Sequence, residues 1–427
     1  MSGYLHRERS LMAKKNKVIF VLIDALGANY FLEHRERMPY LAALADSNLF
    51  AERVQPATPG TSRPGRATIL TGVDTSIHGV YGNSILDGDF FRPATENDVQ
   101  ATTVAQAALE AGLDVVGLGF GLLRPEDTTV QIDPWWEHLQ YKGPSNIKIP
   151  SRRENANVAP VRRDPKRRLS PFLNAPLTAG SSQSADVRLH PHMIGLASDQ
   201  LMLRLAGDLA CGDQPPDLIL TEFSITDVIQ HHHGFDSAAT NWAYQTADMA
   251  VGLLMHRLSK AGRLNDYVVI IASDHGQAPI HTAIYPELVV PHDSWTSEGA
   301  SLNVVVTDVN EALIIADRLS RLGVAPLDGM HLPAAVRAKG LITFVAPTGY
   351  AFERRPDKSA MTETTGSPSI VSTHGLSPGH PGDDAIAIVA GAGARGCIAS
   401  GDLTQVAPTI AQALGLDLPS AHGLAWI

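Results

Sequence analysis

The sequence of 427 residues predicts an α/β protein built on a large, mostly parallel sheet that is sandwiched by helices. Short apolar segments alternate along the chain with longer segments of helical periodicity, which is typical of parallel sheets. Several apolar segments also lack polar alternation, as in YVVIIAS at Tyr267–Ser273. Such segments indicate strands that are buried on both faces, and a smaller strand–helix–strand pattern later in the chain predicts a further α/β unit.

The expected elements follow in chain order. The first strand is Val18–Ile23, an apolar segment between Lys17 and Asp24. The other strands of the main sheet share that apolar, β-branched character and are Val115–Leu118, Leu218–Glu222, Tyr267–Ser273 and Ala385–Ala390. The expected helices carry an apolar face with a period near 3.6 residues. They span Pro39–Asn48, Val99–Ala111, Thr240–Ala261 and Leu403–Leu414, and the strand–helix–strand pattern is Leu302–Val306, Glu311–Leu322 and Leu341–Ala346.

This pattern divides the chain into a core and two additions. Residues 1–280 and 370–427 are expected to form the α/β core, and residues 281–369 an inserted α/β subdomain. Residues 142–185 are expected to leave the core as a basic loop, because Lys142–Arg168 carries nine Lys and Arg against Glu154 and Asp164. The loop is either a solvated surface segment, or a lid or oligomer arm near an anionic substrate.

The amino-acid composition restricts the kinds of partner and the cellular location expected for the protein. The 34 basic and 44 acidic residues give a net charge of −10, which argues against a nucleic-acid partner. Only two cysteines, a first apolar segment too short for a signal peptide, and no apolar stretch of roughly 20 residues predict a cytoplasmic protein without a membrane span. A homo-oligomer is compatible with the sequence. The 17 histidines raise the question of a metal site.

Polar residues capable of binding metal stand at the ends of the predicted strands. In chain order they are Asp24, Asp227, His231, Asp274, His275, His374 and His380. Because the carboxyl ends of parallel strands share one edge of a sheet, we expect these side chains to meet. Asp and His suit zinc or a similar divalent ion, and their number exceeds the need of one tetrahedral ion. They suit two ions about 3.5–4 Å apart that clamp a phosphoryl group.

The candidate nucleophile lies in Thr58–Gly72, TPGTSRPGRATILTG, which begins with turn formers and becomes helical from about Arg66. A hydroxyl at a helix N-terminus lies beside free backbone N–H groups and the positive end of the helix dipole. Ser62 is the candidate on this ground. The alternative is that Thr58, Thr61 or Ser62 only caps the helix.

The chain resembles the alkaline phosphatase superfamily. Within it, the chain resembles the type I phosphodiesterase/nucleotide pyrophosphatase branch, which is related to phosphonoacetate hydrolase. The matching motifs run in order along nearly the whole chain. They are Asp24, Ser62-Arg63-Pro64-Gly65-Arg66-Ala67-Thr68-Ile69-Leu70-Thr71-Gly72, His78-Gly79-Val80-Tyr81-Gly82-Asn83, Asp227 with His231 and Gly234, Asp274-His275-Gly276, and His374-Gly375. The resemblance implies an alkaline-phosphatase-like fold, in which residues 1–280 and 370–427 are the catalytic α/β core and the insertion at residues 281–369 is a cap over the active site.

It also implies roles for single residues. One metal ion would take Asp24, Ser62, Asp274 and His275, and the other would take Asp227, His231 and His374, with His380 as the alternative to His374. Zinc is expected, and the same ligands also serve manganese or iron. Ser62 would attack phosphorus and form a phospho-serine. Asn83, the backbone N–H of Arg63, and Arg66 would contact a small anionic phosphoester or phosphonate.

The leading hypothesis is therefore a two-metal hydrolase of phosphodiester or nucleotide pyrophosphate bonds. Two departures from the family pattern leave alternatives open. Asp24-Ala25-Leu26-Gly27 lacks the glycine that the family carries directly after the aspartate, and Ser62-x-Pro-x-Arg66 fits the signature of sulfatases. The rivals are a formylglycine-dependent sulfatase or phosphonate monoester hydrolase, a phosphonoacetate-type C–P hydrolase and, as a lesser alternative, a binding protein with a degenerate site.

Overall fold

The computed structural model describes residues 16–137, 161–169, 191–355, 363–391 and 393–427. The strands of its main sheet are β1 (Lys17–Ile23), β2 (Leu49–Gln55), β5 (Val115–Leu118), β6 (Val130–Ile132), β7 (Val161–Arg163), β8 (Leu218–Phe223), β9 (Tyr267–Ala272), β19 (Ala385–Ala390), β20 (Gly396–Ile398) and β21 (Gly401–Asp402). Their order across the sheet is β20–β2–β19–β9–β1–β8–β5–β6–β7, and β21 pairs with β2.

The sheet is mostly parallel, as the sequence predicts. β1 lies in the middle and pairs in parallel with β8 and β9, and β5 pairs in parallel with β8 and β6. The antiparallel member near the centre is β19, which joins β9 to β2. The strands of the parallel segment therefore end along one edge, which is where the fold collects the polar side chains described below.

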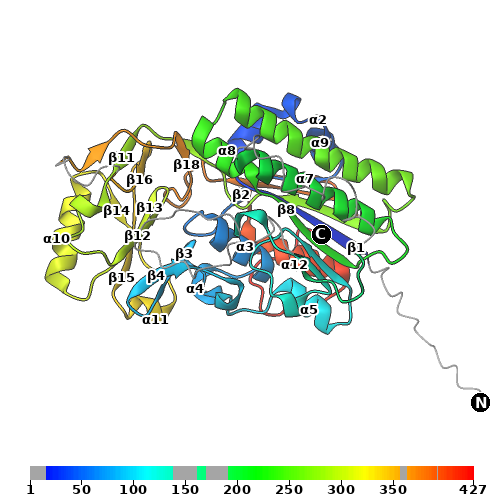
Figure 1. Cartoon of the computed structure of the whole chain (residues 1–427), viewed down its shortest axis with the longest axis horizontal. Coiled ribbons are helices and arrows are strands. Elements are labelled where there is room, and N and C mark those ends of the chain that lie inside the picture. Colours follow the sequence, from blue (N-terminus) through cyan, green and yellow to red (C-terminus); the bar gives the residue numbers. More distant parts are fainter. Residues whose placement is uncertain (1–15, 138–160, 170–190, 356–362, 392) are drawn as a thin grey trace, which may run out of the picture.

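Helices cover both faces of the sheet (Figure 1). On one side are α2 (Pro39–Ser47), α7 (Pro191–Ala210), α8 (Ile225–His233) and α9 (Ala238–Lys260), and on the other are α3 (Ser62–Thr71), α5 (Val104–Glu110) and α12 (Val406–Leu414). Consecutive residues of β1 point to opposite layers, so that Ile19 packs in the first apolar core and Phe20 in the second. This two-sided burial explains why the strand is apolar without alternation.

A second, smaller sheet lies at one end of the molecule (Figure 1). It consists of β12 (Trp295–Glu298), β13 (Ser301–Val305), β15 (Leu341–Val345) and β14 (Ala325–Pro326), and α10 (Val309–Ser320) packs on it. The predicted strand–helix–strand pattern is present, but β13 and β15 are antiparallel neighbours. This part has its own apolar core, and we propose that residues 281–369 act as a cap on the main sheet.

The structure adds elements that the sequence prediction omits. Both β2 and the 20-residue helix α7 are absent from the prediction, and α3 begins at Ser62 rather than near Arg66. Most of the predicted basic loop, residues 142–160 and 170–185, lies outside the described residues, and β7 belongs to the short described part between them. Among the helices that the structure describes, none is long and apolar enough to span a membrane.

Candidate metal centre

The aspartates of the predicted site lie just beyond three neighbouring strands. Asp24 follows β1, Asp274 follows β9 after one residue, and Asp227 lies in the first turn of α8, directly beyond β8. His231 lies one helical turn after Asp227, so that both side chains point from the same face of α8. His275 follows Asp274 directly in sequence. The parallel pairing of β1 with β8 and β9 therefore gathers ligands that are distant in sequence.

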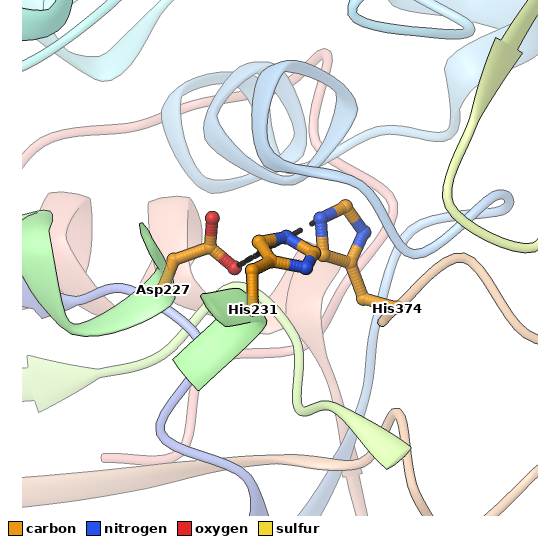
Figure 2. A group of neighbouring side chains, drawn as sticks. All are labelled: Asp227, His231 and His374. Carbon is orange, nitrogen blue, oxygen red and sulfur yellow. Dashed lines mark ion pairs between the residues drawn. The ribbon is translucent and has the colours of Figure 1, made fainter. Parts of the chain in front are cut away.

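His374 arrives from a separate segment, directly after β18 (Ser372–Thr373), which pairs with β10 (Ala278–Pro279). Figure 2 shows its ring beside the ring of His231 and the carboxyl group of Asp227. The Nε2 atoms of His231 and His374 lie 3.3 Å and 3.9 Å from Oδ1 of Asp227. By contrast, Nε2 of His380 lies 3.2 Å from the Thr348 hydroxyl. Of the two candidate histidines in this loop, His374 is the one in the cluster.

A second group of donor atoms shares Asp227 with the first. Asp24, Asp227 and His275 bring ligand atoms within 4.8 Å of one another. Nε2 of His275 lies 3.6 Å from Asp24 Oδ1 and 3.7 Å from Asp274 Oδ2. The ring of His275 stacks on that of His374, with centroids 4.1 Å apart, so the two groups form one continuous centre.

The three histidines hold the same tautomer for the same reason. Each Nδ1 lies beside a backbone carbonyl: Ser372 for His231 at 2.7 Å, Gly276 for His275 at 3.0 Å, and Gly60 for His374 at 3.1 Å. Because a carbonyl only accepts a hydrogen bond, Nδ1 carries a proton, and in each ring that is neutral Nε2 keeps a free lone pair. These lone pairs point into the centre, as metal ligation requires.

The charge of the centre also suits cations. Burial raises the pKa of Asp24 well above its ordinary value, and the Asp274 carboxylate raises it further. Burial likewise raises the pKa of Asp274 to about 6, and it lowers the pKa of His275 and of His374. Burial also disfavours the charged form of Asp227, but the neighbouring His231 outweighs it and holds the pKa of Asp227 below its usual range. Burial lowers the pKa of His231, but the Asp227 carboxylate outweighs it and raises that pKa to about 9. Crowded carboxylates beside the neutral imidazoles of His275 and His374 are the electrostatic pattern of a divalent metal site.

Ser62 is the first residue of α3 and faces this centre. Its Oγ lies 3.2 Å from Nε2 of His275. Thr61 holds the N-cap position with extended backbone, yet its hydroxyl makes no capping hydrogen bond. A serine placed one residue inside the helix, with its hydroxyl directed at the cluster, is free for chemistry rather than engaged in capping.

Asn83 connects the nucleophile candidate to the predicted phosphoryl pocket. Its Oδ1 accepts a hydrogen bond of 2.7 Å from the backbone N–H of Arg63. The guanidinium of Arg63 turns away from Ser62, because it donates to the carbonyl of Ala94 and stacks on Trp136 at 4.9 Å. The backbone of Arg63, rather than its side chain, therefore belongs to the immediate surroundings of Ser62.

Arg66 occupies a place that the sequence does not predict. Its side chain is 1% exposed and binds three carboxylates: Asp24 at 2.7 Å, Asp274 at 2.9 Å and Glu222 at 2.9 Å. The guanidinium thus lies behind the two predicted metal ligands instead of facing solvent. This geometry favours a positioning role for Arg66 over the substrate contact expected from its motif.

Three residues near the centre are missing from the sequence prediction. Glu222 is the penultimate residue of β8 and pairs with Arg66, while Gln277 donates a hydrogen bond of 2.5 Å to Oδ1 of Asp227. Glu298 enters from β12 of the cap and accepts a hydrogen bond of 2.8 Å from the backbone N–H of Asn83. The position of Glu222 at a strand end is a signal that sequence analysis can use, whereas nothing in the segment around Glu298 marks it.

The backbone after Asp24 accounts for the missing family glycine. Ala25 has a φ of 59°, in the left-handed region that favours glycine. Its N–H lies 3.3 Å from Asp274 Oδ1, and its carbonyl accepts a hydrogen bond of 2.6 Å from the Tyr244 hydroxyl. The chain therefore keeps a glycine-type conformation at this position, at a cost of about 1–2 kcal/mol for a residue with a Cβ atom.

Comparisons with known proteins show similarities in sequence and in fold. Residues 18–330 match the family model of type I phosphodiesterase/nucleotide pyrophosphatase. A Schizosaccharomyces pombe protein named as an uncharacterized pyrophosphatase/phosphodiesterase is 27% identical over 266 residues, which cover 62% of this chain and 45% of that protein. The matched part of the chain thus spans less than half the length of this relative.

Solved structures show the same fold at low sequence identity. Human ectonucleotide pyrophosphatase/phosphodiesterase 5 has a TM-score of 0.64 at 14% identity, covering 94% of this chain and 95% of its own. An inactive murine form of the same protein, in complex with AMP, has a TM-score of 0.67 at 13% identity, covering 96% of this chain and 97% of its own.

Proposed function

The chain belongs to the type I phosphodiesterase/nucleotide pyrophosphatase family and is a hydrolase acting on phosphoester bonds, and from this premise we propose that it cleaves phosphodiester or nucleotide pyrophosphate bonds at a two-metal centre with Ser62 as the nucleophile. The observation that carries the proposal is the convergence of Ser62 Oγ with two groups of metal-binding side chains. The murine structural relative in complex with AMP supports a small nucleotide-like phosphoester as substrate.

The residues fit two divalent ions. Oδ1 of Asp24 is a buried carboxylate oxygen without a hydrogen-bond partner, and it faces His275 Nε2 at 3.6 Å. Such an orphaned oxygen is costly unless a cation binds it. In the proposed assignment Asp24, Ser62, Asp274 and His275 hold one ion, and the other ion is held by Asp227, His231 and His374. Bound zinc would supply Lewis acidity and charge neutralisation for the phosphoryl group.

The proposed reaction uses Ser62 Oγ and the helix behind it. Oγ bonds to phosphorus, and the phosphorus–oxygen bond to the leaving group breaks on the opposite side. The proton of the Ser62 hydroxyl passes to solvent, and the leaving oxygen takes a proton from solvent. A water molecule then attacks phosphorus, the bond between phosphorus and Oγ breaks, and Oγ regains a proton as the phosphoryl product leaves. The N-terminal end of α3 stabilises the developing negative charge, because the helix dipole is positive there.

Asn83 and the backbone of Arg63 complete the proposed phosphoryl site. The hydrogen bond between them, 2.7 Å long, fixes the Asn83 amide beside Ser62. In that position the amide NH₂ group donates to a phosphoryl oxygen. A donor held in place before the substrate arrives stabilises charge in the transition state without reorganisation.

The formylglycine alternative requires Ser62 to be converted to another chemical group before catalysis. Conversion of the serine to formylglycine removes two hydrogen atoms from this side chain, so mass spectrometry of the purified peptide distinguishes the two forms. We expect the unmodified mass. The histidine pair on Asp227 supports this expectation, because it adds a nitrogen-rich second group to the carboxylates around Arg66.

Replacement of the nucleophile tests the proposal directly. Ser62→Ala is expected to reduce hydrolysis of an aryl phosphodiester by at least about 1000-fold, as loss of a nucleophile does in other covalent hydrolases. Zinc content, measured by elemental analysis, should stay near that of the wild type because six other ligands remain. Ser76→Ala removes a hydroxyl on the nearby helix α4 (Thr75–His78) and serves as the control. Unchanged turnover by Ser62→Ala would refute the assignment.

A further inference from the structure

The cap contacts the metal centre through the turn between β12 and β13. The N–H of Ala300 donates to the carbonyl of His374 at 3.0 Å, and the Ser301 hydroxyl donates to the carbonyl of Gly375 at 2.8 Å. Gly299 has a φ of 56°, and a Cβ atom there would lie 2.4 Å from the Thr373 hydroxyl. The close fit requires glycine, and it fixes the position of the residue before it, Glu298.

Glu298 directs its carboxyl group at the proposed phosphoryl site. Its Oε2 accepts the backbone N–H of Asn83 at 2.8 Å, and the Asn83 side chain forms a second hydrogen bond with the same carboxyl group. The other end of the Asn83 amide accepts the N–H of Arg63, the residue next to Ser62. The Asn83 side chain thus lies between the Glu298 carboxyl group and the proposed position of the phosphoryl oxygens.

The surroundings of Glu298 disfavour additional negative charge. Burial raises the pKa of Glu298 to about 7, and the Asp227 carboxylate also raises it, against the opposing effects of the Asn83 hydrogen bonds and the charge of Arg63. The Arg63 guanidinium is held 3.9 Å from Glu137 and over Trp136. At alkaline pH the site therefore presents an ionised carboxylate beside the substrate oxygens.

We propose that Glu298 is a specificity-determining residue that makes the centre prefer monoanionic phosphodiesters to dianionic phosphomonoesters. A diester carries one negative charge at the phosphoryl group, and a monoester above neutral pH carries two. Because Glu298 and the substrate share Asn83 as a partner, the second charge of a monoester meets the Glu298 carboxylate. This inference rests on the proposed function, since it places the phosphoryl group beside Ser62 and Asn83.

The test compares three variants of the zinc-loaded protein at pH 9. Glu298→Gln keeps an oxygen that accepts the Asn83 N–H but removes the charge. It should raise the ratio of monoesterase to diesterase kcat/KM about tenfold, measured with 4-nitrophenyl phosphate and bis(4-nitrophenyl) phosphate. Glu298→Asp retains the charge and should keep the wild-type preference. Glu311→Gln removes a carboxylate from α10 of the same cap, outside the centre, and should leave the ratio unchanged.

Binding of inorganic phosphate gives a readout that needs no turnover. Calorimetry at pH 9 should show about tenfold tighter phosphate binding to Glu298→Gln than to the wild type, because the removed charge no longer repels the dianion. Equal ratios and equal phosphate affinities in the two proteins would overturn the role of Glu298, as would a change of the same size in Glu311→Gln. Tighter phosphate binding without hydrolysis of any ester would support Glu298 and overturn the proposed function instead.

Discussion

Arg66 carries the only side-chain positive charge that directly contacts both Asp24 and Asp274 in the described part of the chain. It also pairs with Glu222, whose other oxygen accepts the indole N–H of Trp136 at 2.6 Å. A fully buried cation among three carboxylates is stable only while all partners stay in place. Arg66 therefore fixes the orientation of two proposed metal ligands before any ion binds.

Removal of the positive charge of Arg66 should destabilise the folded protein. Arg66→Met is expected to lower the free energy of unfolding of the chelator-treated protein by about 3–5 kcal/mol, because Glu222 is left as an uncompensated buried charge. Urea denaturation measures the loss. Arg53→Met is the control: its partner Asp384 is 3.0 Å away, but Arg53 is 40% exposed, so about 1 kcal/mol or less is expected. Similar losses in the two variants would contradict the structural role of Arg66.

Some residues of the candidate site can be predicted from the sequence and others cannot. Asp24, Asp274 and His275 are predictable, because they lie within three residues of the ends of apolar strands that must meet. Glu298 is not, because its contact with Asn83 joins a cap strand to a core loop more than 200 positions away in the sequence. No local pattern encodes such a contact, and it depends on how the cap is seated on the sheet.

Helix α3 lies unusually close to the strand ends. A Cβ atom on Gly65 would come within 2.8 Å of the Asp274 Cβ, so glycine is needed for Ser62 to reach the centre. Gly65→Ala should therefore displace α3 and lower kcat/KM for an aryl phosphodiester about 10–100-fold, since small displacements at a reacting centre have effects of that size. Initial rates and thermal denaturation measure the two consequences.

Another helical glycine provides the matched control. At Gly207 in α7 the nearest atoms to an added Cβ lie at 3.5 Å, which is ordinary contact. Gly207→Ala should keep full activity and gain about 0.5–1 kcal/mol of stability from helix propensity. Full activity in Gly65→Ala would show that α3 tolerates the side chain and that the close approach has no role in placing Ser62.

The elements missing from the sequence prediction have physical explanations. The core-facing side of α7 includes Asp199, which is 2% exposed and accepts the N–H groups of Ser224 and Ile225 at 2.8 Å. This buried carboxylate interrupts the apolar stripe that marks a helix. Strand β2 carries Glu52 and Arg53 in its middle, and Arg53 pairs with Asp384, so its sequence lacks a continuous apolar run.

The molecule as a whole should lose stability in acid through buried neutral histidines. His78 is fully buried, its Nδ1 accepts the Val80 N–H at 3.2 Å, and its Nε2 lies 3.0 Å from the Thr68 hydroxyl. Burial lowers the pKa of His78 to about 3, and it lowers the pKa of His331 to about 4. Both histidines stay neutral in the folded protein at pH values where they are protonated in the unfolded chain.

The sign of the effect follows from proton binding. Below the ordinary histidine pKa of about 6.5 the unfolded chain binds more protons, so the stability present above that pH is lost as the pH falls toward the folded values, by about 1.4 kcal/mol per pH unit and histidine. Between pH 6.5 and pH 5 the chelator-treated wild type should lose about 1.5 kcal/mol more than His78→Gln in urea denaturation. The exposed His256→Gln should behave as wild type. Equal pH dependence of all three proteins would exclude this contribution.

At this scale the sequence prediction succeeds because the fold class follows from periodicity. Alternation of helices with apolar strands implies a parallel sheet. In a parallel sheet, the edge formed by the carboxyl ends of the strands is rich in polar side chains. What periodicity cannot supply is the direction of late strands. β19 runs antiparallel between β9 and β2, and β13 and β15 are antiparallel in the cap, although each strand has an unremarkable apolar sequence.

The central place of β1 has a consequence for synthesis. Val18 pairs with Leu218 on one side and with Val268 on the other. Ribosomes add roughly 5–20 residues per second, so about 10–40 s pass between the emergence of β1 and that of its first partner. Throughout this interval the nascent chain carries an unpaired apolar strand, which is a template for aggregation. We therefore expect the nascent chain to depend on chaperones early in translation, long before the edge that carries the proposed metal ligands can assemble.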